Sequence, residues 1–184
     1  MTSGTGSGKT ESFLLPVIAR LLDERLGQNH LTINRWWEKN WSSERSWAGV
    51  RKRGGSIKPA VRAMVLYPTN ALVEDQMSRL RKTAILSKDI NEGKPLFYFG
   101  RYTGSTPGGT ECPPEILDAK WKKRIQAESK EINDIQKESL SLVDKDMDIR
   151  AQLPESTCGE MLTRWDMIDA PPDIFITNLS MLNV

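Results

Sequence analysis

Two kinds of apolar pattern alternate along the chain. Three short segments are almost continuously apolar: residues 61–67, 95–104 and 171–178. Such runs are typical of strands that are covered on both faces of a parallel sheet. Elsewhere, apolar residues recur three or four positions apart, as on amphipathic helices. The alternation predicts an α/β fold with a parallel sheet.

The first predicted helix covers about residues 8–26. Pro16 lies inside it, where the missing N–H removes one backbone hydrogen bond and is expected to kink or loosen the helix. Gly27 and Asn29 indicate its end.

A second helix is expected after residues 61–67, with Asn70 as its N-cap. Four apolar residues mark its buried face: Val73, Met77, Leu80 and Ala84. Three cations are expected to be solvated: Arg79, Arg81 and Lys82.

Residues 28–60 have the character of an insertion, in which tryptophans alternate with cations. The tryptophans are Trp36, Trp37, Trp41 and Trp47. One interpretation is that they stack bases while the cations neutralise phosphates. The other is packing, which the spacing favours because Trp37, Trp41 and, less well, Trp47 fall on one helical face.

Residues 115–168 are a second predicted insertion. Up to about residue 151 they read as a charged helical segment with a broken apolar seam, too polar for a core. The seam consists of Trp121, Ile125, Ile132, Ile135 and Leu142, interrupted at Glu128 and Ser139. A short coiled-coil hairpin and a single surface helix are both open. Residues 161–168 predict a further weak helix.

Composition narrows the function classes. The 184 residues carry a net charge of +2, which by itself indicates no nucleic-acid partner. Cys112 and Cys158 stand far apart, so they predict neither a zinc site nor a disulfide framework, and free thiols suit the cytosol. The single histidine, His30, excludes an H-E-x-x-H metalloprotease site. No apolar stretch approaches the ~20 residues that span a bilayer.

The chemistry of the chain is concentrated at its start. Residues 3–11 read Ser-Gly-Thr-Gly-Ser-Gly-Lys-Thr-Glu, close to the phosphate-loop pattern G-x-x-x-x-G-K-[ST], with Ser3 where that pattern has glycine. The glycines allow successive amide groups to turn toward an anion. Lys9 can reach the β- and γ-phosphates, and the Thr10 hydroxyl can bind Mg²⁺. A flexible Gly/Ser-rich terminus is the alternative.

Four segments follow one another in a recognisable order and spacing. They are residues 3–11, 67–72 (Tyr-Pro-Thr-Asn-Ala-Leu), 102–104 (Tyr-Thr-Gly) and 172–178 (Pro-Asp-Ile-Phe-Ile-Thr-Asn). These resemble motifs I and Ia, the Y-x-G turn and motif Ib of the superfamily 2 DEAD/DEAH-box helicases. The resemblance spans nearly the whole chain apart from the two insertions. It is nearest to large bacterial helicases, including those of defence systems and DNA repair.

The resemblance implies a partial RecA-like P-loop NTPase domain over residues 1–184, with insertions at about 28–60 and 115–168. It implies ATP and Mg²⁺ as cofactors, with Lys9 and Thr10 in catalytic roles and Thr10 as the magnesium ligand. The implied nucleotide-binding residues are Gly4, Thr5, Gly6, Ser7, Gly8, Lys9, Thr10 and Glu11. The implied nucleic-acid-binding residues are Pro68, Thr69, Asn70, Gly104, Thr177 and Asn178.

The two free thiols and the lack of a long apolar stretch lead us to expect a cytoplasmic protein without membrane contact. Its expected partners are nucleic acid, DNA in preference to RNA, and other subunits of a defence or repair complex. The family's acidic motif II would lie beyond Val184, and a strand would precede residue 3. We therefore expect this chain alone to fold marginally and not to hydrolyse ATP. A truncated remnant that binds nucleotide or nucleic acid weakly is the alternative function. A small-molecule kinase is a further alternative, and it is disfavoured because such an enzyme has no need of segments 67–72 and 172–178.

Overall fold

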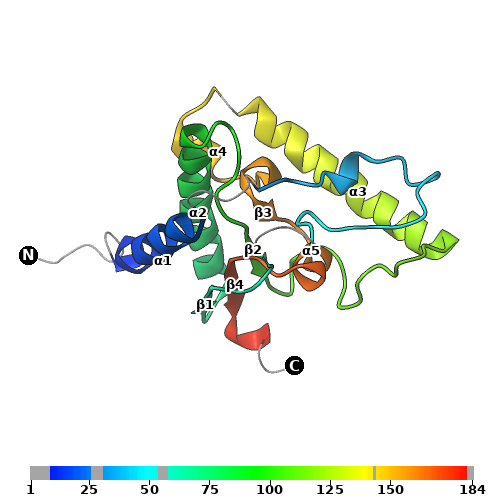
Figure 1. The fold of residues 1–184 in the computed structure, drawn as a ribbon, viewed down its shortest axis with the longest axis horizontal. Coiled ribbons are helices and arrows are strands. Elements are labelled where there is room, and N and C mark those ends of the chain that lie inside the picture. Colours follow the sequence, from blue (N-terminus) through cyan, green and yellow to red (C-terminus); the bar gives the residue numbers. More distant parts are fainter. Residues whose placement is uncertain (1–8, 26–30, 54–57, 143, 182–184) are drawn as a thin grey trace, which may run out of the picture.

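A four-stranded parallel sheet forms the centre of the molecule (Figure 1). A computed structural model of the chain describes residues 9–25, 31–53, 58–142 and 144–181. The strands are β1 (Ala63–Tyr67), β2 (Phe99–Tyr102), β3 (Glu160–Met161) and β4 (Ile174–Asn178). Their order is β1-β4-β2-β3, and every neighbouring pair is parallel. The predicted parallel α/β fold is confirmed.

Helices cover the sheet on both faces. They are α1 (Lys9–Arg25), α2 (Asn70–Ile90), α3 (Ala119–Ser141), α4 (Met147–Arg150) and α5 (Arg164–Asp169). Three 3₁₀ turns complete the elements: η1 (Trp36–Glu38), η2 (Ser156–Cys158) and η3 (Leu179–Met181). One core lies between the sheet and the pair α1 and α2, and a second lies between the sheet and η1, α3 and α5.

The two cores follow from the two-residue period of the strands. Ile174 and Ile176 of β4 point into the core with α1 and α2, whereas Phe175 packs into the other. Phe99 and Tyr102 of β2 divide in the same way. A strand that is buried on both faces has to be apolar throughout, which explains why these segments are recognisable in the sequence.

The first two predicted helices are present. α1 runs through Pro16 without interruption, and the predicted end at Gly27 and Asn29 lies outside the described residues. All four apolar positions predicted for the buried face of α2 are buried. The N-cap prediction was wrong by one residue: Thr69 takes that position, without a side-chain capping bond, and Asn70 begins the helix.

Arg81 corrects a second prediction for α2. It is 1% exposed, not solvated. Its Nη2 lies 2.8 Å from Oε1 of Glu160, and its Nε lies 2.9 Å from Oε2. This bidentate pair is buried on both sides and ties α2 to β3. The i, i+4 pattern of α2 could not reveal it, because the partner is contributed by a strand 79 residues away.

The tryptophans of residues 31–53 pack into the core, but not from a helix as their spacing predicted. Only η1 is helical there, and the rest is irregular chain wrapped around α3 and α5. Trp36 is the centre, with ring centroids of four other tryptophans between 5.6 and 6.3 Å away: Trp37, Trp41, Trp47 and Trp165. We call these five residues and Trp121 the tryptophan cluster. Packing, the favoured interpretation, is confirmed.

Asp166 of α5 anchors this cluster. Its buried carboxylate accepts hydrogen bonds from Trp36 Nε1 at 2.8 Å, Val50 N at 3.0 Å and Thr163 Oγ1 at 2.7 Å. Burial raises the pKa of Asp166 to about 6. The carboxylate thus joins residues 36–50 to a helix more than a hundred positions later in the chain.

The charged segment forms one helix, α3, followed by the single turn α4. Ile125 and Ile132 of α3 are fully buried against the tryptophan cluster, so the expectation that this segment is too polar for a core was wrong. Its buried face also contains three polar residues: Ser129, Gln136 and Ser139. Residues 161–168 were predicted as a helix, but Met161 belongs to β3 and α5 begins at Arg164.

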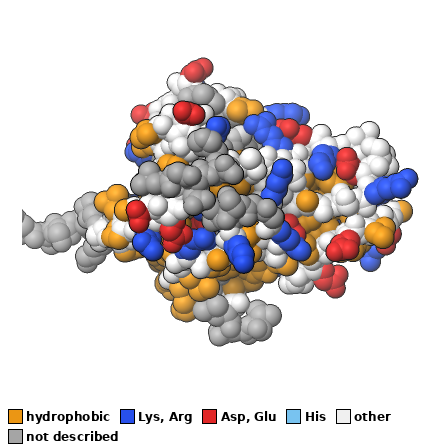
Figure 2. All heavy atoms as spheres, in the orientation of Figure 1, with side chains coloured by type: hydrophobic (Ala, Val, Ile, Leu, Met, Phe, Trp, Pro, Cys, Tyr) orange, Lys and Arg blue, Asp and Glu red, His pale blue; other side chains and the backbone are white. Residues whose placement is uncertain are grey.

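β1 is an outer strand of the sheet. Within the described residues it pairs with β4 only. Met64 and Leu66 are exposed on its outer face, and Figure 2 shows hydrophobic side chains gathered over this part of the molecule. No helix of the described part is long and apolar enough to cross a membrane.

Candidate nucleotide and nucleic-acid sites

The carboxyl ends of three strands meet at one edge of the sheet. Tyr67 of β1 pairs with Asn178 of β4, and Tyr102 of β2 pairs with Thr177. The segments that follow these strands are therefore neighbours, with roughly 10 Å between the tips of β1 and β2 across β4. Ligands of open parallel sheets bind at such edges. We call residues 68–70, 103–106 and 177–178 the carboxyl edge.

Two of the six predicted nucleic-acid residues are buried at this edge. Thr177 is 1% exposed, and its Oγ1 donates to the carbonyl oxygen of Tyr102 at 2.6 Å. Asn178 is 4% exposed, and its Nδ2 donates to Oδ1 of Asn70 at 2.5 Å. Oδ1 of Asn178 accepts hydrogen bonds from Ser180 Oγ and the Met181 backbone N–H. Both side chains thus fasten the strand tips together.

The other four predicted residues are exposed: Pro68, Thr69, Asn70 and Gly104. Thr69 is the N-cap of α2, but its side chain makes no capping hydrogen bond. The first amide groups of a helix have no partner within the helix, and the helix dipole adds positive potential there. The start of this 21-residue helix therefore favours anions at the carboxyl edge.

A turn at the end of β2 completes the edge. The Thr106 backbone N–H donates to the Thr103 carbonyl at 3.1 Å, and the Thr103 N–H donates to Thr106 Oγ1 at 3.0 Å. Thr103 and Thr106 are buried, whereas Gly104 and Ser105 between them are exposed. Arg164 of α5 donates to the carbonyl oxygens of Gly104 and Thr106. The sequence prediction missed Arg164 and Ser105, although the spacing of Thr163 and Asp166 is a recognisable capping-box signal for the start of α5.

α1 is oriented so that its start faces the same edge. At its other end, Arg25 Nη2 lies 2.6 Å from Oδ2 of Asp173, which immediately precedes β4. Closer to its start, Leu14 lines a groove together with Asp75 from the early turns of α2. Since α2 begins where β1 ends, the first residues of α1 lie toward the carboxyl edge. Lys9, Thr10 and Glu11 begin this helix, and residues 3–8 lie outside the described residues.

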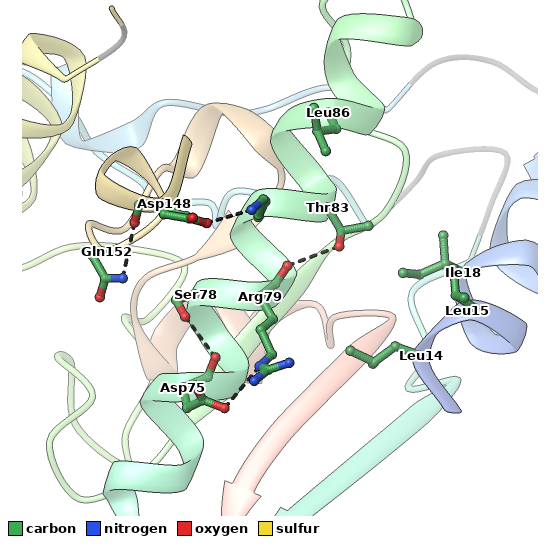
Figure 3. Close-up of a pocket in the computed structure, with 12 residues that line it drawn as sticks. Leu14, Leu15, Ile18, Asp75, Ser78, Arg79, Thr83, Leu86, Asp148 and Gln152 are labelled. Atoms are coloured by element: carbon green, nitrogen blue, oxygen red, sulfur yellow. Dashed lines mark hydrogen bonds and ion pairs between the residues drawn. The ribbon is translucent and has the colours of Figure 1, made fainter. Parts of the chain in front are cut away.

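The groove between α1, α2 and α4 has a volume of about 510 Å³ (Figure 3). Leu14 and Ile18 of α1 form its apolar side. On α2, Arg79 Nε pairs with Asp75 Oδ2 at 3.1 Å. Burial raises the pKa of the nearby Tyr67 phenol, which remains a neutral hydrogen-bond donor at the end of β1.

A group of ion-paired side chains lies at the amino ends of the strands. Asp173 is fully buried and pairs with three arginines: Arg25, Arg51 and Arg62. Its Oδ2 also accepts the Tyr98 backbone N–H at 2.8 Å. These contacts join α1, residues 31–53, β1 and β4 on the side away from the carboxyl edge. Within the described residues, no group of three or more His, Cys, Asp or Glu side chains could hold a metal ion.

Comparison with known proteins identifies the family. The model of the DEAD/DEAH box helicase family matches residues 1–96. The chain therefore belongs to the DEAD/DEAH box helicases, and its parallel sheet is part of a P-loop NTPase-type domain. It is 40% identical over 112 residues to the Druantia protein DruE of Escherichia coli (strain UMEA 4076-1). That match covers 58% of this chain and 5% of the relative's length. No solved structure matches the chain.

Proposed function

We propose that the chain is the part of an ATP-dependent helicase or translocase that joins a nucleotide site at residues 3–11 to a nucleic-acid site at the carboxyl edge. One observation carries the proposal. The start of α1 and the tips of β1, β2 and β4 all lie toward the carboxyl edge of the sheet, since the other end of α1 pairs with Asp173 at the amino end of β4. A change at the nucleotide can therefore be transmitted over a short distance to the polynucleotide.

The nucleotide site is assigned from the family and from the position of α1. From the family pattern, the amide groups of Gly4, Thr5, Gly6, Ser7 and Gly8 would bind phosphate oxygens, and Lys9 would neutralise the β- and γ-phosphates. The dipole of α1 adds to this field, since the segment lies directly before the helix. Thr10 and Glu11 follow in the first turn, and the Thr10 hydroxyl would be a ligand of Mg²⁺. Mg²⁺ held there would stabilise the charge on the transferred phosphoryl group.

The nucleic-acid site is assigned to the sugar–phosphate backbone. Thr69, Asn70 and Gly104 are exposed and offer amide groups and small polar side chains, while Pro68 shapes the turn before α2. Thr177 and Asn178 position these groups through their hydrogen bonds to Tyr102 and Asn70. Contacts of this kind fix the register of a strand without selecting its sequence. We expect DNA to be preferred to RNA.

The nucleotide site is tested by titrating a fluorescent ATP analogue with Mg²⁺ into the wild-type protein and Lys9→Ala. A hydrogen bond to a charged group contributes about 1.5–3 kcal/mol, so the variant is expected to bind roughly 10- to 100-fold more weakly. Arg20→Ala is the matched control, because Arg20 is an exposed cation on the same helix that pairs with Asp23 and Glu24. Equal affinities of wild type and Lys9→Ala would overturn the assignment.

The nucleic-acid site is tested by fluorescence anisotropy with labelled single-stranded DNA and RNA of identical sequence. The logarithm of the affinity is expected to fall linearly with that of the salt concentration, by about 0.7 per neutralised phosphate on a single strand. Absence of binding to both oligonucleotides would reject the polynucleotide part of the proposal. Steady ATP turnover stimulated by the oligonucleotides separates an enzyme from a non-enzymatic binder.

A further inference from the structure

The turn over residues 103–106 presents two adjacent amide groups. Within the described chain, neither the Gly104 N–H nor the Ser105 N–H donates to a protein acceptor. The peptide between Thr103 and Gly104 is fixed because its carbonyl accepts the Thr106 N–H at 3.1 Å. Successive amide groups in a turn form a concave anion site. The turn is thus suited to a phosphate oxygen.

Arg164 fixes the second peptide of this turn. Its Nη2 donates to the Gly104 carbonyl at 2.8 Å, and its Nε donates to the Thr106 carbonyl at 3.2 Å. The carbonyl of Gly104 and the N–H of Ser105 belong to one planar trans peptide and point in opposite directions. When Arg164 holds that carbonyl, the Ser105 N–H is directed away from the protein.

Three further contacts hold Arg164 itself. Its backbone N–H donates to the Pro107 carbonyl at 2.9 Å. Its guanidinium lies over the Tyr102 ring, 5.6 Å from the centroid. The capping box of Thr163 and Asp166 fixes the start of α5, the helix that Arg164 begins. An arginine can reach two carbonyls and an aromatic face together because its planar guanidinium carries several donors at fixed angles, which a lysine lacks.

We propose that Arg164 is a positioning residue for the nucleic-acid backbone, which holds the Gly104–Ser105 peptide so that the Ser105 N–H meets a phosphate oxygen. This inference rests on the proposed function and adds two residues to its site. Arg164 acts through the turn, because two of its guanidinium nitrogens are already committed to carbonyl oxygens.

The test compares wild-type protein, Arg164→Lys and Arg164→Ala in anisotropy titrations with single-stranded DNA over a range of salt concentrations. Loss of one well-directed hydrogen bond to a charged oxygen corresponds to about a tenfold weaker affinity. Both variants are expected to show this loss with an unchanged salt slope. Arg53→Ala is the matched control, since Arg53 pairs with Asp169 at the other end of α5 and is expected to bind like wild type.

Each other outcome is decisive. If Arg164→Lys binds like wild type and Arg164→Ala lowers the salt slope by about 0.7, Arg164 contacts a phosphate directly as a charge and the proposal fails. Near-ultraviolet circular dichroism of the tryptophan cluster reports whether the fold is intact. Loss of that signal in Arg164→Lys would overturn the proposal by making Arg164 a general stabiliser. If wild type binds DNA and both variants match it, only this inference fails, whereas no binding by wild type rejects the proposed function.

Discussion

The tryptophan cluster and the carboxyl edge use polar groups in opposite ways. In the cluster, five of the six tryptophans are buried, and Asp166 accepts hydrogen bonds from two separate segments. At the edge, the buried side chains of Thr177 and Asn178 hold the strand tips together by hydrogen bonds. Thr69, Gly104 and Ser105 remain exposed. The polar groups of the cluster stabilise the fold, whereas some polar groups of the edge stay available to a ligand.

The difference shows that the topology, and not the local composition, decides which side chains are buried and which polar groups stay available to a ligand. Tryptophans among lysines and arginines have the composition of a base-stacking surface. Here they pack against one another, and Arg51, one of the cations among them in the sequence, is buried and paired with Asp173. The edge has an ordinary composition, but a parallel sheet brings its segments together at the end where ligands bind.

The largest expected effect follows from Trp165→Ala in the cluster. Trp165 is fully buried and contacts the rings of Trp36, Trp47 and Trp121. Removing such a side chain is expected to lower the free energy of unfolding by about 3–5 kcal/mol. Urea denaturation measures it, with Ile116→Ala as the exposed control. A stable variant with weakened DNA binding would instead make the cluster a binding surface.

The second effect is a pH dependence that belongs to Asp166. Its folded-state pKa of about 6 lies above the value of 3.8 for an unperturbed aspartate, because burial disfavours the charged form. Between these pH values the folded state holds the extra proton, so stability is full below about 3.8 and falls as the pH rises to about 6. At about 1.4 kcal/mol per pH unit, the total loss is about 3 kcal/mol.

Asp166→Asn tests this assignment with nearly the same shape. The amide does not ionise, so the decline in unfolding free energy between these pH values should disappear. Its NH₂ group would also face the Thr163 N–H, which costs about 1 kcal/mol at all pH values through the lost capping box. Urea titrations at several pH values check both effects. A variant that retains the wild-type pH dependence would assign it to another group.

Much of the fold was predictable because it depends on local or periodic signals. Apolar runs located β1, β2 and β4, and the spacing of apolar residues located α2 and its buried face. The convergence of the strand tips also followed, since parallel strands end at a common edge. What each predicted side chain does there did not follow: Thr177 and Asn178 are buried and used within the protein.

The predictions that failed share a physical cause: contacts with residues distant in the sequence override local patterns. β3 contains only two residues and is held by pairing with β2, so it has no pattern of its own. Arg81 resembles any helix-surface arginine until Glu160 is placed beside it. The face of α3 that carries Ser129, Gln136 and Ser139 is buried because distant segments cover this helix. Asn133 Nδ2 donates to the Trp37 carbonyl at 2.7 Å, and Gln136 Nε2 donates to the Pro154 carbonyl at 3.0 Å.

A smaller effect is expected at the buried part of the carboxyl edge. Asn178→Ala removes the bond to Asn70 and the acceptor for Ser180 and Met181. We expect a loss of about 1–3 kcal/mol in unfolding free energy and weaker DNA binding, because Asn70 and the strand tip lose their mutual support. Asn70→Ala is the comparison, since it removes only one of these bonds. Equal stability of both variants and wild type would show that the tips are held by the sheet alone.

The smallest effect on stability, and the sharpest test of the comparison, is Gly104→Ala. A Cβ at Gly104 meets no atom within 4 Å, so the methyl group would stand in open space beside the amide groups of the turn. Stability is expected to stay level or rise by about 0.4–1 kcal/mol because the alanine restricts the unfolded chain, while DNA binding falls because the methyl group obstructs the phosphate.

Gly108→Ala in the same loop is expected to have the opposite effect, with stability lowered and DNA binding retained. Gly108 has φ +83° and its Cβ would lie 3.2 Å from Trp165, so that variant is expected to lose stability first. Unchanged DNA binding by Gly104→Ala would remove the turn from the interface.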